Sequence, residues 1–134
     1  MDFVYDLTVS AALGDDNPKR SVLPDFSGVI HLVEIEQAPG CNGEVYAAVY
    51  QGLHQVWPSN DEGAYRSNGR VYSTREHYLV KRGDPSLILL VWSAGTTYEH
   101  TVQFRLSVLP VEIMEPWRKQ ESLLAKITKI FGVR

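Results

Sequence analysis

Apolar and polar residues alternate with a period of two along most of the first 110 residues, and no other feature constrains the fold as strongly. The alternation is clearest at the two ends of this stretch, in Phe3, Tyr5, Leu7 and Val9 and again in Val102, Phe104, Leu106 and Val108. Successive side chains of a strand point to opposite faces, so each such segment is typical of a strand with one buried face.

Turn-forming residues divide the alternating region into short segments. Glycine, proline and asparagine gather at 14–18, 39–43, 68–69, 83–85 and 95–97. A strand is expected at about 28–36, with Val29, His31, Val33 and Ile35 on one face. Residues 87–92 are apolar on both faces, which predicts a central strand. Alternating βα units are absent, so the sequence predicts a mainly β fold, an antiparallel β-sandwich or partly open barrel of about six to eight strands.

The pattern changes after residue 114. Pro116 suits the first position of a helix, and Gly132 suits a helix stop. Between them one apolar stripe at helical spacing contains Leu123, Leu124, Ile127, Ile130 and Phe131. The sequence therefore predicts a single domain over 1–134, with the sandwich in 1–114 and an amphipathic C-terminal helix in 115–131.

The apolar stripe of this helix has three possible roles. It can cover the sheet of its own domain, dock on a partner or neighbouring copy, or lie on a membrane. The stripe is short and no apolar run approaches the roughly 18 residues of a membrane span, so we do not expect a membrane as a partner. The five stripe residues are the candidate interface.

Charge is divided unevenly along the chain. Residues 1–64 carry ten acids and two bases, a net charge of −8, whereas residues 65–134 carry eleven bases and six acids, a net charge of +5. If the fold keeps the two halves apart, copies attract one another head to tail. If strands from both halves interleave, the asymmetry averages out in space.

No motif with a catalytic or metal-binding mechanism occurs. The four histidines form neither His-x-His nor His-Glu-x-x-His, and Cys41 is the only cysteine. Phosphate-binding glycine loops and a nucleophile elbow are also missing from the sequence. We therefore expect no enzyme activity, no cofactor and no bound metal.

Aromatic and basic residues alternate in segment 65–82. Tyr65, Arg70, Tyr72 and Tyr78, together with Trp57 nearby, are candidates for stacking on a carbohydrate or another ligand. The same mixture of cations and rings suits single-stranded nucleic acid, although the isoelectric point of about 5.8 argues against it.

The leading hypothesis is a non-enzymatic structural protein that forms a homo-oligomer or larger assembly, such as a viral or bacterial particle component. A ligand-binding sandwich is the alternative, and nucleic-acid binding through 65–82 is a third. The N-terminal residues lack the basic start and apolar run of a secretory signal, so the cytoplasm or a virion is the expected location.

Overall fold

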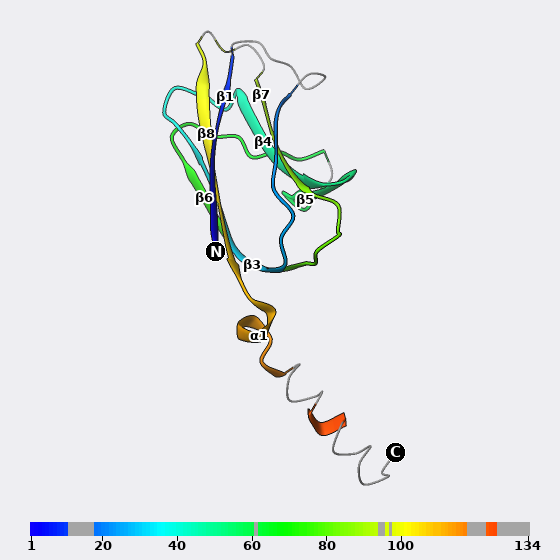
Figure 1. Cartoon of the computed structure of the whole chain (residues 1–134). Coiled ribbons are helices and arrows are strands. Elements are labelled where there is room, and N and C mark those ends of the chain that lie inside the picture. Colours follow the sequence, from blue (N-terminus) through cyan, green and yellow to red (C-terminus); the bar gives the residue numbers. More distant parts are fainter. Residues whose placement is uncertain (11–17, 61, 94–95, 97, 118–122, 126–134) are drawn as a thin grey trace.

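The computed structural model describes residues 1–10, 18–60, 62–93, 96, 98–117 and 123–125, which form two antiparallel sheets of four strands each (Figure 1). The elements are β1 (Asp2–Val9), β2 (Lys19–Val22), β3 (Gly28–Gln37), β4 (Val45–Gln51), β5 (His54–Trp57), β6 (Val71–Val80), β7 (Leu87–Ser93), β8 (His100–Leu109) and the short helix α1 (Val111–Met114). The predicted antiparallel sandwich is confirmed.

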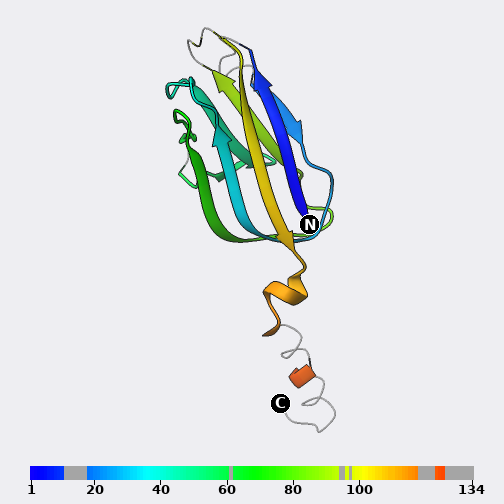
Figure 2. The same cartoon turned by 90° about the vertical axis from the view of Figure 1, so that its left-hand side faces the viewer.

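The strand order is β1-β8-β3-β6 in the first sheet and β2-β7-β4-β5 in the second sheet. β1 pairs with β8, β2 with β7, β3 with β6 and β4 with β5, so the pairs are nested about the turn between β4 and β5. Gly52 in that turn has a φ of 61°, which favours glycine. The chain is thus one long hairpin rolled into two layers (Figure 2), which is the jelly-roll arrangement. β7 lies between β2 and β4, so the prediction of a central strand at 87–92 is confirmed.

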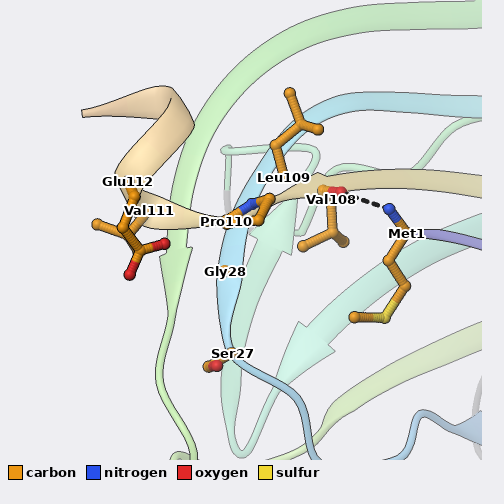
Figure 3. Close-up of a pocket in the computed structure, with 8 residues that line it drawn as sticks. All are labelled: Met1, Ser27, Gly28, Val108, Leu109, Pro110, Val111 and Glu112. Atoms are coloured by element: carbon orange, nitrogen blue, oxygen red, sulfur yellow. Dashed lines mark hydrogen bonds between the residues drawn. The ribbon is translucent and has the colours of Figure 1, made fainter. Parts of the chain in front are cut away.

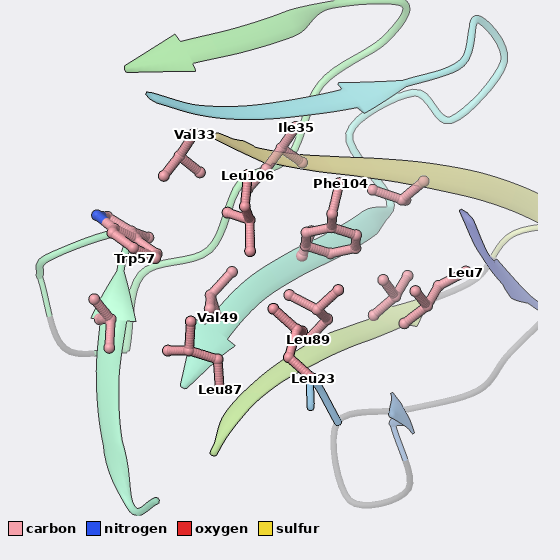
Figure 4. Close-up of a cluster of buried hydrophobic side chains, with 14 of the residues drawn as sticks. Leu7, Leu23, Val33, Ile35, Val49, Trp57, Leu87, Leu89, Phe104 and Leu106 are labelled. Carbon is pink, nitrogen blue, oxygen red and sulfur yellow. The ribbon is translucent and has the colours of Figure 1, made fainter. Parts of the chain in front are cut away.

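The core lies between the two sheets (Figure 4). In most of the strands residues of one parity are directed into it, as the alternation predicts. Its largest fully buried side chains include Phe104, Leu23, Ile30, Ile35, Leu87 and Leu89. Each such side chain stabilises the fold by about 1.5–3 kcal/mol when it leaves water, so the two facing apolar surfaces hold the layers together.

The face predicted for β3 is wrong at its start. The register of β3 against both β6 and β8 shifts between Ile30 and Leu32, which leaves His31 as an extra residue. Such a bulge reverses the parity of the strand. Ile30 therefore joins Val33 and Ile35 in the core, while Val29 lies outside this cluster.

The helix predicted over 115–131 also differs from the structure. The first helical turn is α1, which precedes the predicted start, and the described residues are helical again at Trp117 and at 123–125. Glu115 interrupts the helix with φ −132° and ψ 64°, because the ring of Pro116 disfavours helical geometry in the preceding residue. Among the described residues no helix is long and apolar enough to cross a membrane.

Candidate functional site

The segment that follows β8 leaves both sheets at one end of the sandwich (Figures 1 and 2). None of the residues of α1 is buried. Large apolar side chains along this segment face solvent, with exposed fractions of 62% for Ile113, 50% for Trp117, 59% for Leu123 and 63% for Leu124. In its described part the segment therefore does not cover the core of its own domain.

Two of the five predicted interface residues, Leu123 and Leu124, are thus exposed apolar side chains on a helical turn. Ile127, Ile130 and Phe131 lie outside the described residues. The structure leaves the interface assignment as a prediction, and it places its described members where another surface can reach them.

The root of the segment is fixed to the first sheet. Glu115 is only 8% exposed, and its carboxylate lies 2.9 Å from Nε2 of His77 on β6. The amino group of Met1 donates a hydrogen bond of 2.8 Å to the carbonyl of Val108, just before the segment begins. The segment is therefore anchored at its base, while the apolar side chains of Ile113 and Trp117 remain exposed.

A hollow of about 310 Å³ lies at this root (Figure 3). It is lined by Met1, Ser27, Gly28 and residues 108–112. A Cβ on Gly28 would lie 2.6 Å from Cγ1 of Val108 and 2.9 Å from the carbonyl oxygen of Leu109, so only glycine permits this approach of β3 to β8. The lining is mostly apolar, with the carboxylate of Glu112 as its one charged side chain.

The nested pairing shows whether the acidic and basic halves of the chain lie apart or interleave in the first sheet. It places β1 and β3, from the acidic half, next to β8 and β6, from the basic half. Arg105 on β8 lies 3.0 Å from Glu36 and 3.6 Å from Glu34, both on β3. On this sheet the halves interleave, so the sequence asymmetry does not become a separation of charge there.

The second sheet has an apolar outer face that was not predicted from the sequence. Three neighbouring pairs from β4 and β7 lie on it: Tyr46 with Trp92, Ala48 with Leu90, and Tyr50 with Ile88. The rings of Tyr46 and Trp92 are parallel, with centroids 5.6 Å apart. The sequence signal for this face was the run at 87–92, which is apolar on both faces. A central strand of an antiparallel sheet requires only one apolar face, so its central position does not account for the second one.

The aromatic residues proposed for ligand stacking are packed against the protein. Trp57 is buried in the core, and its ring packs edge-on against that of Tyr78, with the two ring centroids 5.3 Å apart. The ring centroids of Tyr65 and Tyr72 are 5.0 Å apart, and the guanidinium carbon of Arg70 is 5.1 Å from the Tyr72 ring centroid. Burial raises the pKa of Tyr65 and of Tyr78, with smaller contributions from nearby acids.

The bases of segment 65–82 are divided between different surfaces. Arg66 lies over the ring of Tyr46 on the outer face of the second sheet, with its guanidinium carbon 4.8 Å from the ring centroid. Arg75 is exposed on β6 and lies opposite Leu32 in the first sheet. Strand alternation and the change of layer separate these cations, so the sequence run is not one continuous basic strip.

The described residues offer little for catalysis. No three of their His, Cys, Asp and Glu side chains gather as metal ligands. Cys41 is fully buried, and burial raises the pKa of its thiol, which favours the unreactive protonated form.

The sequence matches no protein-family model and none of the curated proteins. Three solved structures illustrate its structural similarities. The Yersinia pseudotuberculosis-derived mitogen is 9% identical with a TM-score of 0.43, over 81% of this chain and 86% of the mitogen. The capsid of cyanophage Pam1 is 10% identical with a TM-score of 0.46, over 79% and 81% of the two chains.

The third similar structure is a disulfide-linked pilus protein from Bacillus endospore appendages. It is 12% identical with a TM-score of 0.36, over 81% of this chain and 88% of that protein. At these identities and TM-scores the similarities carry no argument about function, which has to be inferred from the surfaces of this chain.

Proposed function

We propose that this protein is a non-enzymatic structural protein that assembles with copies of itself through its C-terminal segment. The observation that carries the proposal is the exposure of Ile113, Trp117, Leu123 and Leu124 on a segment that leaves both sheets. An amphipathic helix has to bury its stripe against another element, and the described part of this one has no such element in its own domain. Such an assembly is the kind of structure from which a viral or bacterial particle is built.

Two further points support self-assembly: the apolar character of the exposed segment and its anchored start. Continuous exposed apolar patches are rare on monomers and commonly mark an interface. The anchoring of Glu115 by His77 fixes where the segment starts, which reduces the ordering that a neighbour has to impose.

The test is the native mass of the full chain at micromolar concentration, measured by light scattering and native mass spectrometry. We expect a defined multimer. The double substitution Leu123→Asp/Leu124→Asp removes two apolar contacts, each of which stabilises by about 1.5–3 kcal/mol when fully buried, and should raise the dissociation constant at least about tenfold.

Ala125→Asp is the matched control, because it adds one carboxylate to the same exposed helical turn without removing a large apolar side chain. We expect a smaller loss of assembly in this variant. A monomeric wild-type chain, or a multimer unchanged in the double variant, contradicts the proposal.

A further inference from the structure

The outer face of the second sheet is an apolar surface that the described residues cover only in part: Ala48 is fully buried and Arg66 lies over Tyr46, while Tyr50, Leu90 and Trp92 stay half-buried. Its middle consists of the three pairs Tyr46 with Trp92, Ala48 with Leu90 and Tyr50 with Ile88. Val22 on the neighbouring strand β2 extends it, at 57% exposure. The outer face of an antiparallel sheet is normally polar where it meets water, so a surface of this composition indicates an interface.

This face is hollowed along its middle. A depression of about 330 Å³ is lined by Leu90, Trp92 and Tyr50, with Pro18 also lining it, and with Gly63 and Glu62 contributed by the loop after β5. Gln55 holds that loop in place, because its side-chain amide donates to the carbonyls of Pro58 and Gly63 at 2.9 and 3.0 Å. A hollow of this kind suits a convex partner such as a helix, whereas a second hollow face would leave it partly empty.

The dimensions fit a helix. Four strands spaced by about 4.8 Å give a width of roughly 14 Å, and a helix with side chains is about 10–12 Å across. Positions 88 to 92 span about 13 Å of strand, and positions 123 to 131 span about 12 Å as the helix that their periodicity predicts. The apolar stripe of the C-terminal segment therefore matches the apolar strip of this face in length.

The location of the root favours a neighbour's segment over the chain's own. His77, which anchors Glu115, lies on β6 in the first sheet, whereas the hollow faces outward from the second sheet. The chain's own segment starts on the opposite layer and leaves the sandwich at one end (Figure 2).

We propose that the outer face of the second sheet receives the C-terminal segment of a second copy of this chain, an inference that rests on the proposed function. Donor and acceptor are then different surfaces of the same protein. A contact of this heterologous kind adds copies head to tail, and it closes into a ring or continues as a filament.

Two acceptor variants test the receiving face in the full chain. Leu90→Asp places a charge in the floor of the hollow. Val22→Asp places it on the exposed edge strand β2, where folding is less at risk, and circular dichroism checks that both variants fold. The matched control is Val4→Asp, because Val4 is 56% exposed on edge strand β1 and lies on the outer face of the first sheet.

We expect both acceptor variants to raise the dissociation constant of self-association at least about tenfold and Val4→Asp to leave it unchanged. Mixing an acceptor variant with the donor variant Leu123→Asp/Leu124→Asp should restore one contact and yield a 1:1 dimer at a concentration at which each variant alone is monomeric. Analytical ultracentrifugation of the separate and mixed samples measures this directly.

The outcomes separate the two proposals. If the donor variant loses assembly while both acceptor variants keep it, self-assembly stands and the receiving face is overturned. A mixture that stays monomeric also overturns it, as does an equal loss of assembly in Val22→Asp and Val4→Asp. A wild-type chain that is monomeric refutes the proposed function itself.

Discussion

The two outer faces of this sandwich differ in chemistry although they belong to the same rolled hairpin. On the first sheet, neighbouring strands are joined by polar pairs: Thr8 with Thr101 at 2.8 Å, Asp6 with Gln103 at 3.0 Å, and Arg105 with two glutamates of β3. On the second sheet, the corresponding positions of β4 and β7 hold only aromatic and aliphatic side chains. Folding requires just one buried face per sheet, so the apolar outer face of the second sheet points to a further contact.

The largest expected effect is a loss of unfolding free energy, and it should differ between two adjacent residues of β7. Leu89 is fully buried between the sheets, and Leu89→Ala should cost about 2–5 kcal/mol of unfolding free energy. Leu90 lies on the outer face and is only partly covered, so Leu90→Ala should cost less than about 1.5 kcal/mol in the monomer. Urea unfolding in the Leu123→Asp/Leu124→Asp background measures both costs without a contribution from assembly. Equal costs would place Leu90 in a second core of the same protomer.

A smaller effect is expected on the polar face. Arg105→Ala removes the cation that lies between Glu34 and Glu36, and all three side chains are partly exposed. Solvent screens such pairs, so we expect a loss of about 0.5–1 kcal/mol that decreases with added salt. Thermal unfolding gives the loss, and light scattering should show an unchanged multimer. Dissociation of the multimer by this substitution would make the polar face an interface too.

The smallest expected effect is the change of stability with pH that comes from a phenol packed on the core. Burial, with a smaller contribution from Asp84, raises the pKa of Tyr78 above its usual value near 10. The neutral phenol therefore stabilises the fold fully below about pH 10, and this stability is lost as the pH rises through the raised pKa. Urea midpoints measured from neutral pH to above pH 10 should fall, and Tyr78→Phe should reduce the slope.

Local patterns of the sequence predicted much of the fold. The period of two identified most of the strands but not β2, whose four residues show no apolar alternation, and the two-sided apolar run at 87–92 identified a central strand. The bulge at His31 could not be predicted, because it is defined by the register against β6 and β8 rather than by residues of β3 alone. The early end of α1 was available in principle from Glu115, which precedes a proline.

The candidate site was predictable only in part. The helical spacing of the C-terminal stripe predicted that Leu123 and Leu124 belong to one apolar face, but the sequence left open whether that face covers its own domain, so their exposure is known only from the structure. The receiving face does not, because it combines side chains of β4 and β7, which become neighbours only through the nested pairing. The same topology explains why the charge split along the sequence had little predictive value: in the first sheet it places strands of the acidic half beside strands of the basic half.

The nested pairing also sets the order in which this protein can be completed. β8 lies in the middle of the first sheet, between β1 and β3, so neither strand can pair with it until residue 109 has left the ribosome. Contacts so distant in sequence are typical of slow folding, in milliseconds to seconds. During synthesis the first sheet therefore forms last, and the segment that we assign to assembly emerges only after every strand is available. Premature association of half-made chains is thereby disfavoured.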